Sequence, residues 1–282
     1  MTEWIWLNGE IMPLSEARIG VEDRGFQFAD GVYEVVRFYN GKLFTLQQHL
    51  QRLQRSADGI QLTIPMETAK LGDEIGKLLA RAALREGMIY LQLTRGCAPR
   101  SHAFPQCSPT LLFYARALAP ASEPGAGEGV KLMTVPDERW RRCWIKSIAL
   151  LPNVLAKSQA IAAGADEAVF IENDLVTECS ASNIFAVIGP RLVTHPIGSK
   201  VLPGITRALL LELAVTIGLE VDERVFQEEE ARRADELFIT STTREVSWVA
   251  RWNDRYIGQG RCGPVTKKLH SALRQLVLRD TA

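Results

Sequence analysis

The chain has 282 residues, 46% of them hydrophobic, and its 33 basic residues balance its 33 acidic residues. This length and composition suit one large domain or two ordinary ones, and the balanced charge excludes a global attraction to nucleic acid or anionic membranes. The start, Met-Thr-Glu-Trp-Ile-Trp, has an acid where a signal peptide needs positive charge, and no apolar run approaches the ~20 residues of a membrane helix. We therefore expect a soluble, cytoplasmic protein that binds neither nucleic acid nor membranes.

Two β-hairpins are predicted near the start of the chain. The dipeptide Asn-Gly, which favours a tight two-residue turn, occurs at residues 8–9 and again at 40–41. Before the second turn, β-branched and aromatic residues alternate with polar ones, as in a half-buried strand. The expected strands are Trp4 to Leu7, Glu10 to Met12, Val32 to Phe38 and Lys42 to Thr45.

Helices and further strands complete a predicted small N-terminal domain, residues 1–118, of α+β type. From Leu46 to Ile60, apolar residues recur at three- and four-residue spacing, which predicts a helix with one buried face. A second amphipathic helix is predicted from about Met66 to Arg85, and Gly87 is placed to end it. The remaining expected strands are Met88 to Thr94 and Thr110 to Ala115.

A segment rich in Pro, Gly and Ala, residues 119–129, lacks an apolar period and is predicted to link two domains. Residues 130–282 are then expected to form a larger C-terminal domain. Its expected elements are helices at Pro152 to Ala163, Thr206 to Ile217 and Val265 to Arg279, and strands at Val130 to Val135, Ala168 to Glu172, Asn183 to Val187 and Glu236 to Thr240. Because hairpins alternate with single helices, a mixed-sheet pseudobarrel fits better than a doubly wound parallel sheet.

Four short segments of this chain carry groups that together suit the cofactor pyridoxal phosphate. Lys146, in an apolar stretch, offers an amine for a Schiff base with the cofactor's aldehyde, and Glu178 offers a carboxylate for the ring nitrogen. The turns Gly204-Ile205-Thr206 and Ser241-Thr242-Thr243 offer backbone amides and hydroxyls for the phosphate. In combination, the four segments predict a cofactor site in which the C-terminal domain carries the lysine.

Each segment has a simpler interpretation when it is taken alone. Lys146 would then lie on the exposed face of a half-buried strand, Glu178 in a solvated turn, and Thr206 at the N-terminal cap of a helix. Similarly, Arg100 and His102 could bind a carboxylate together, but a plain exposed loop would look much the same. The combination and order of the segments, and no single one, favour the cofactor site.

The cysteines and the other histidines predict no further chemistry. Five cysteines, without any C-x-x-C pair, favour reduced thiols that pack in the interior. His49, His195 and His270 are not clustered as metal ligands are, so no metal site is expected.

Several longer motifs extend along the whole chain. They are Glu-Asp-Arg-Gly-Phe-Gln-Phe-Ala-Asp-Gly-Val-Tyr-Glu at 22–34, His-Leu-Gln-Arg-Leu at 49–53, Thr-Arg-Gly-Cys-Ala-Pro-Arg-Ser-His at 94–102, Ile-Lys-Ser at 145–147, Leu-Leu-Pro-Asn-Val-Leu-Ala-Lys at 150–157, Leu-Pro-Gly-Ile-Thr-Arg at 202–207 and Glu-Leu-Phe-Ile-Thr-Ser-Thr-Thr at 236–243. By these motifs the chain resembles the class IV, fold type IV, pyridoxal phosphate-dependent aminotransferases. Within that family it is most similar to the D-amino acid aminotransferases.

The resemblance implies roles for ten residues. Lys146 matches the catalytic lysine that binds the cofactor and moves protons, Glu178 matches the partner of the ring nitrogen, and Leu202 matches the residue packed behind the ring. The phosphate-binding residues implied in the same way are Arg52, Ile205, Thr206 and Thr242. The residues implied to bind the substrate carboxylate are Tyr33, Arg100 and His102, of which Arg100 and His102 come from the neighbouring subunit. A homodimer with shared active sites is therefore implied.

The implied reaction is ping-pong transamination between a D-amino acid, such as D-alanine, and a 2-oxo acid, 2-oxoglutarate or pyruvate. Two residues depart from the family's pattern: Ala181 replaces a serine and Cys179 replaces a glycine. These departures leave the reaction type intact and affect the expected substrate preference and efficiency. The alternatives are an aminotransferase of the same fold that acts on branched-chain L-amino acids or (R)-amines, and a non-enzymatic protein that binds a phosphate ligand.

Overall fold

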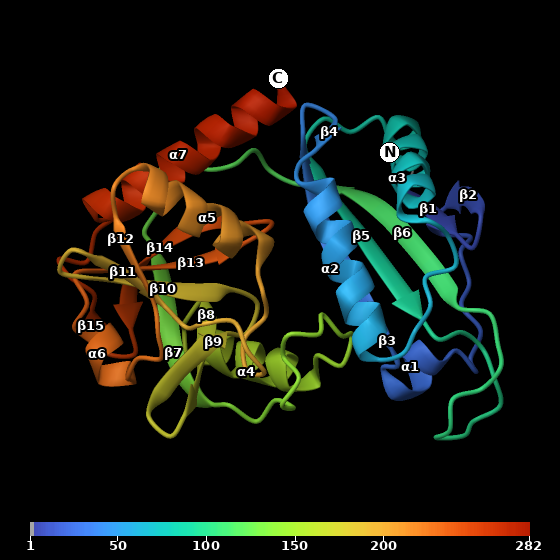
Figure 1. Cartoon of the computed structure of the whole chain (residues 1–282), viewed down its shortest axis with the longest axis horizontal. Coiled ribbons are helices and arrows are strands. Elements are labelled where there is room, and N and C mark those ends of the chain that lie inside the picture. Colours follow the sequence, from blue (N-terminus) through green and yellow to red (C-terminus); the bar gives the residue numbers. More distant parts are fainter. Residues whose placement is uncertain (1–2) are drawn as a thin grey trace. The chain divides into compact units, whose positions relative to one another are not determined.

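The computed structural model describes residues 3–282, so Met1 and Thr2, which open the predicted N-terminal domain, lie outside the described residues. Contacts divide the chain into two units (Figure 1). The first unit extends to Pro120 and includes Ile145–Ala149 and Asp280–Ala282, and the second contains Ala121–Trp144 and Leu150–Arg279. The predicted domain boundaries stay a prediction. Lys146, which we expected in the C-terminal domain, groups by its contacts with the first unit.

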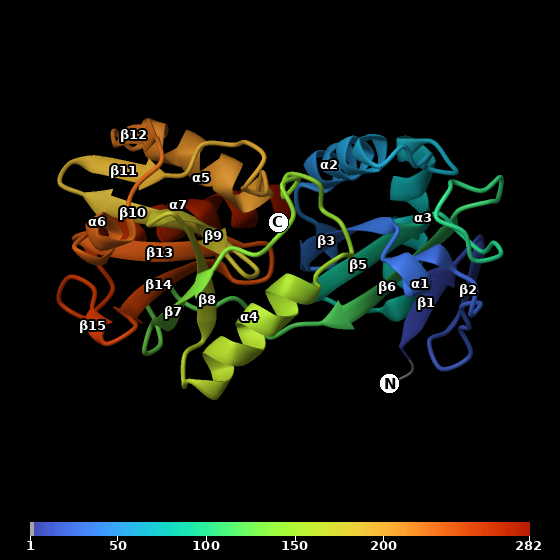
Figure 2. The same cartoon turned by 90° about the horizontal axis from the view of Figure 1, so that it is seen from below.

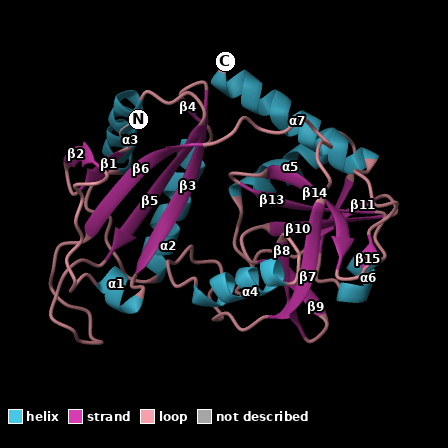
Figure 3. Cartoon of the chain, turned by 180° about the vertical axis from the view of Figure 1, so that it is seen from behind, coloured by secondary structure: helices cyan, strands magenta, loops and turns pink. Residues whose placement is uncertain are grey.

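Within residues 3–120, six strands form one antiparallel sheet in the order β2-β1-β6-β5-β3-β4 (Figure 3). These strands are β1 (Trp4–Leu7), β2 (Glu10–Pro13), β3 (Gly31–Tyr39), β4 (Lys42–Leu43), β5 (Gly87–Thr94) and β6 (Thr110–Ala117). Helix α2 (Leu46–Gly59) packs on β3, helix α3 (Thr68–Ala82) packs on β1 and β6, and the short α1 (Arg24–Phe28) precedes β3. Apolar side chains from the sheet and both longer helices are buried between them.

Both predicted hairpins are confirmed. Asn8 and Gly9 have φ angles of 48° and 109°, and Asn40 and Gly41 have φ angles of 51° and 77°. Positive φ at both central residues is what a type I′ turn requires. The strand predicted from Lys42 to Thr45 is shorter than expected. It ends at Leu43, because Thr45 already occupies the N-terminal cap of α2.

The predicted role of Gly87 as a helix stop is wrong. Helix α3 ends at Ala82, and Ala83 adopts the left-handed conformation with φ of 52°. Gly87 is instead the first residue of β5, where an added Cβ would lie 2.1 Å from the carbonyl oxygen of Arg116. The glycine is therefore required by the close approach of β5 and β6.

Among residues 121–279, nine strands form a mixed sheet in the order β12-β11-β10-β13-β14-β7-β8-β9, with β15 paired to β14. The strands are β7 (Val130–Pro136), β8 (Glu167–Glu172), β9 (Leu175–Cys179), β10 (Asn183–Ile188), β11 (Arg191–Thr194), β12 (Glu220–Glu223), β13 (Glu236–Ser241), β14 (Glu245–Trp252) and β15 (Arg255–Tyr256). Strand β7 is parallel to both β8 and β14, whereas β13 is antiparallel to β10 and β14. Strand β9, at one end of this order, also contacts β10, so the sheet curls as predicted.

The helices of the second unit cover this sheet. Helix α4 (Leu151–Ala162) packs on β7 and β8 (Figure 2), α5 (Ile205–Thr216) packs on β12 and β13, and the short α6 (Glu228–Arg232) contacts β9. Helix α7 (Pro264–Thr281) follows, and its residues up to Arg279 belong to this unit. No helix within residues 3–282 has both the length and the apolar character that crossing a membrane would require.

Candidate active site

Lys146 is fixed by its backbone to the first unit. Its carbonyl oxygen accepts a hydrogen bond from the Tyr33 amide at 2.9 Å, and its own amide donates to Ser56 Oγ on α2 at 3.1 Å. The neighbouring Ser147 forms an isolated bridge with Val32, so the segment Ile145–Ala149 lies along the start of β3. These contacts fix the backbone position from which the Lys146 side chain extends.

The Lys146 amine lies against an aromatic ring. Its Nζ is 4.3 Å from the centroid of the Tyr33 ring, and the side chain is half-buried. The Tyr33 ring in turn stacks on Tyr90 with 5.8 Å between centroids, and Tyr90 stacks on Tyr114 at 5.2 Å. Two of the sequence-predicted residues, Lys146 and Tyr33, are thus brought into contact.

Arg52 belongs to a buried charged cluster. Its Nε and Nη2 donate to the two carboxylate oxygens of Glu34 at 2.7 and 2.8 Å, and His49 Nδ1 lies 2.7 Å from Glu34 Oε2. Burial opposes ionisation of Glu34, but the charge and hydrogen bonds of Arg52 outweigh it and hold the Glu34 pKa well below its usual range. Burial also lowers the pKa of His49. The cluster fixes the orientation of Arg52, one of the predicted phosphate ligands.

Arg100 and His102 lie on an exposed loop between β5 and β6. Both rest on Phe28 of α1: the guanidinium carbon of Arg100 is 4.2 Å from the ring centroid, and the His102 ring meets it edge-on at 5.6 Å. The two residues therefore share one support, as expected for a pair that binds the same group. Within the first unit, the side chains of Arg100 and His102 therefore contact α1, whereas the backbone of Lys146 contacts β3 and α2.

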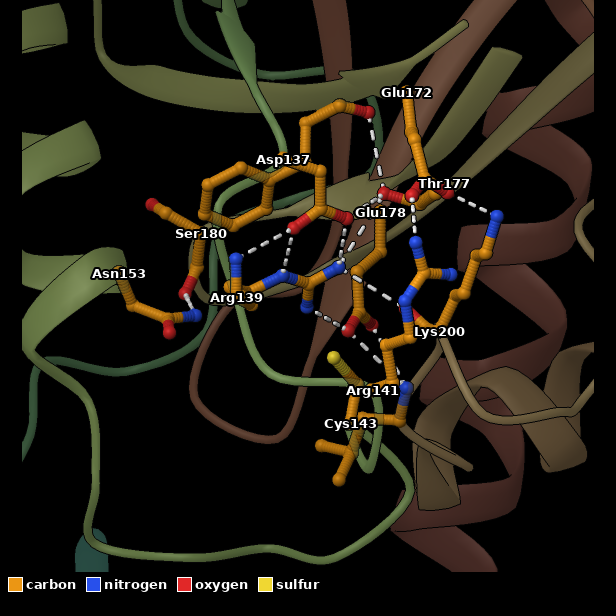
Figure 4. Close-up of polar contacts among 12 residues, drawn as sticks. Asp137, Arg139, Arg141, Cys143, Asn153, Glu172, Thr177, Glu178, Ser180 and Lys200 are labelled. Atoms are coloured by element: carbon orange, nitrogen blue, oxygen red, sulfur yellow. Dashed lines mark hydrogen bonds and ion pairs between the residues drawn. The ribbon is translucent and has the colours of Figure 1, made fainter.

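Glu178 lies near the end of β9 in the second unit, where it is buried and surrounded by donors (Figure 4). Arg139 Nη1 donates to its Oε1, Asn183 Nδ2 donates to its Oε2 at 3.0 Å, and the Leu202 amide approaches the two oxygens at 3.2 and 3.1 Å. Burial raises the Glu178 pKa to about 7, although the charge and hydrogen bond of Arg139 act in the opposite direction. The carboxyl group can thus change its ionisation near neutral pH.

Leu202, Ile205 and Thr206 follow one another around the start of α5. Ile205 and Thr206 are its first two residues, and Gly204 caps it. Asn183 Nδ2, which binds Glu178, also donates to the Leu202 carbonyl oxygen at 2.9 Å. A Cβ on Gly204 would lie 2.1 Å from Asn183 Oδ1, so the glycine leaves the space that Asn183 occupies. The structure therefore connects Glu178, Leu202 and the amide end of α5.

Thr242 lies in the turn between β13 and β14, half-buried. Two residues earlier, one residue before the end of β13, Thr240 is buried and pairs in register with Asn183 of β10. Its Oγ1 has no hydrogen-bond partner among the described residues. A buried hydroxyl without a partner is uncommon and indicates a place where a ligand or water completes the site.

Sequence analysis missed three charged residues of these clusters. Asp137 and Arg139 follow β7, where Arg139 also donates to Asp137 at 2.8 Å, and Glu34 lies on β3 beside Tyr33. An Asp-x-Arg pair immediately after a predicted strand was a visible signal for the first two residues. Glu34 is the last residue of the motif at 22–34. His49 and Arg52 are three apart on one predicted helix, so they share a face on which one carboxylate can pair with both.

Comparison with known proteins identifies the family. Residues 31–252 match the class IV amino-transferase family. The chain is 41% identical over 281 residues to a D-alanine aminotransferase of Bacillus licheniformis, covering 99% of this chain and 98% of that protein. It is 42% identical over 269 residues to a D-alanine aminotransferase of Listeria monocytogenes, covering 94% and 93%. The chain belongs to the class IV aminotransferases.

Solved structures of branched-chain amino acid aminotransferases share the fold. The branched-chain amino acid aminotransferase of Escherichia coli superposes with a TM-score of 0.91 at 26% identity, covering 100% of this chain and 97% of that one. The T.th. branched-chain amino acid aminotransferase with pyridoxamine 5′-phosphate has a TM-score of 0.91 at 27% identity, covering 98% and 94%. The predicted family, enzyme class and fold type IV are confirmed.

Proposed function

We propose that this aminotransferase moves amino groups from a D-amino acid, such as D-alanine, to 2-oxoglutarate or pyruvate by a ping-pong mechanism with pyridoxal 5′-phosphate. The observation that carries the proposal is identity of about two fifths, along nearly the whole chain, to proteins named D-alanine aminotransferase. The pair Arg100 and His102, which the resemblance assigns to the D-specific enzymes, supports the same choice.

The residues of the second unit fit the proposed cofactor. Buried Glu178 supplies a carboxylate whose pKa of about 7 lets it share a proton with a ring nitrogen. Free amides at the start of α5, from Ile205 and Thr206, suit a phosphate, and so do the hydroxyl groups around Thr242. The unpartnered Thr240 hydroxyl leaves a donor for a further polar group. A structural relative named with pyridoxamine 5′-phosphate adds support.

Bound pyridoxal phosphate would supply an electrophilic carbon for the amino group and a ring that accepts electrons from the substrate Cα. In the proposed mechanism, Lys146 would hold the cofactor through Nζ, and its amine, once free, would accept the proton that the substrate loses from Cα and return it to the product. The Tyr33 ring, 4.3 Å from Nζ, limits where this amine can move. Leu202 would pack behind the cofactor ring, and Arg52, whose guanidinium group donates to Glu34, would bind the cofactor phosphate.

Tyr33, Arg100 and His102 are proposed to bind the substrate carboxylate. Arg100 and His102 are exposed within the single chain, which suits side chains that serve the active site of a neighbouring subunit. We therefore propose a homodimer in which each active site uses this pair from the partner. A guanidinium fork and an imidazole donor together hold a carboxylate in one orientation, which selects one face of Cα.

The test is the absorption spectrum of the protein loaded with pyridoxal phosphate, before and after adding single substrates. We expect D-alanine to bleach the band of the lysine-bound cofactor and L-alanine, L-leucine and an (R)-amine to leave it unchanged. The control is Lys146→Ala, which should never form that band and should lose turnover. Bleaching by L-leucine or the amine alone would favour the alternatives of the same fold, and failure to take up the cofactor would favour a non-enzymatic phosphate-binding protein.

A further inference from the structure

The guanidinium group of Arg139 is divided between two carboxylates (Figure 4). Its Nε and Nη2 donate to the two oxygens of Asp137 at 2.9 and 2.8 Å, and its Nη1 donates to Glu178. Nη2 also reaches the Lys200 carbonyl oxygen at 3.0 Å, and the group lies over the Phe170 ring at 4.3 Å. The donors of Arg139 are thus directed by contacts from several segments, and one of them points at Glu178.

This cluster is shielded from water. The side chain of Arg139 is 5% exposed, that of Asp137 is 8% exposed and that of Glu178 is 6% exposed. Thr177 of β9 also belongs to the cluster, because its hydroxyl group donates to Asp137 at 2.8 Å. In such surroundings charges act strongly on one another, because little water is present to screen them.

Two buried carboxylates here compete for one guanidinium. Burial opposes ionisation of Asp137, but Arg139 outweighs it and lowers the Asp137 pKa, whereas burial dominates at Glu178 and raises its pKa to about 7. The nearby thiols add no charge, because burial raises the pKa of Cys143 to about 11 and that of Cys179 well above its usual value. When Asp137 and Glu178 are both ionised, the described side chains of this cluster therefore carry two negative charges and only the one positive charge of Arg139. A protonated ring nitrogen would supply a second positive charge.

We propose that Arg139 is a positioning residue that orients Glu178 and keeps it ionised for its partner, the ring nitrogen of the cofactor, and that Asp137 limits this effect by occupying most of the Arg139 fork. This inference rests on the proposed cofactor. It extends that proposal by naming the pair of residues that decides where the proton between Glu178 and the ring nitrogen lies.

Substitutions of Arg139 and Asp137 should shift the pH midpoint of Glu178 ionisation in opposite directions. In Arg139→Met, the cation that favours the Glu178 carboxylate is gone, so the pH midpoint of Glu178 ionisation should rise by about one unit or more. In Asp137→Asn, the competing anion is gone, so the midpoint should fall. If Arg139 and Asp137 only packed the protein, both variants would loosen the cluster, admit water and move the midpoint in the same direction, toward the ordinary value of Glu.

The midpoint is measured on the full-length protein without cofactor, from the infrared carboxyl band that Glu178→Gln removes, followed across pH. On the loaded protein, the nuclear magnetic resonance shift of ¹⁵N in labelled pyridoxal phosphate reports whether the ring nitrogen is protonated. We expect a protonated nitrogen at pH 8 in the unmodified protein, loss of that signal in Arg139→Met, and partial recovery in Arg139→Lys, which keeps the charge.

Arg141→Met is the matched control, because Arg141 lies two residues away, is 77% exposed and pairs with Glu172 at 3.2 Å. It should leave both readouts unchanged. Midpoint shifts in the same direction in Arg139→Met and Asp137→Asn would overturn the inference. If Arg139→Met does not fold, an unchanged midpoint in Asp137→Asn is enough to overturn it. Failure of the unmodified protein to take up pyridoxal phosphate would instead reject the proposed function.

Discussion

At the scale of single residues, Glu34 connects the stability of the first unit to its proposed chemistry. It is fully buried and holds both Arg52 and His49. A buried ion pair is costly to break, because removing one partner leaves the other charge without compensation. The residue that fixes a proposed phosphate ligand should therefore also stabilise the folded protein.

Glu34→Gln should reduce the free energy of unfolding at pH 7 by about 3–5 kcal/mol, the usual cost of leaving a buried charge unpaired. Because the folded-state pKa of Glu34 is depressed, its stabilisation is complete above the ordinary value of 4.5 and is lost as pH falls below it. The difference between parent and variant in urea unfolding should therefore shrink below pH 4.5.

Glu220→Gln is the control for this measurement, since the side chain of Glu220 is 57% exposed in its ion pair with Arg191. We expect little change in that variant. A Glu34→Gln protein as stable as its parent at pH 7 would contradict the account.

At the scale of secondary-structure elements, the start of α5 depends on Gly204. An added Cβ would meet Asn183 Oδ1 at 2.1 Å, and Asn183 holds both Glu178 and the Leu202 carbonyl. Gly204→Ala should therefore push β10 and the start of α5 apart.

We expect Gly204→Ala to lose about 1–3 kcal/mol of stability in thermal unfolding, as overpacked sites do, and to bind pyridoxal phosphate more weakly in a fluorescence titration. Gly198→Ala serves as the control, because nothing lies within 4 Å of its added Cβ. Equal behaviour of the two variants would show that the contact with Asn183 is unimportant.

Elements with a local signal were predictable from the sequence. The Asn-Gly turns and the apolar face of α2 depend on neighbouring residues only, and both are found where expected. Strands β11 and β12 and helices α1 and α6 were not predicted, because elements of four or five residues without an Asn-Gly turn beside them are too short to show a period. Strand β14 was missed although it is eight residues long, because nearly all its residues are buried and it lacks the alternation of a half-exposed strand.

The charged clusters were less predictable than the elements. Arg139 and Glu178 are 39 residues apart, and their pairing follows from the sheet order, in which β7 and β9 flank β8. Local sequence patterns carry no information about such a pairing. Gly87 illustrates the same limit, because its function depends on the approach of Arg116 from the neighbouring strand.

At the scale of the whole molecule, the proposed dimer can be tested by mixing two inactive variants. Lys146→Ala and Arg100→Leu should each be inactive alone, but if Arg100 serves the partner's site, one site of each mixed dimer carries both intact residues. Random reassociation should then recover about a quarter of the parent's activity. Each variant refolded alone is the control. No recovery from the mixture would indicate that Arg100 acts within its own chain.

The grouping of Ile145–Ala149 with the first unit has a consequence for recombining this enzyme with its relatives. A hybrid gene joined once, within residues 119–129, would combine β3 and α2 from one parent with the lysine segment from the other. The hydrogen bonds from Tyr33 and to Ser56 would then connect segments that never evolved together. A hybrid that takes its N-terminal portion from one parent should therefore take the segment Ile145–Ala149 from the same parent, as a second, separate exchange.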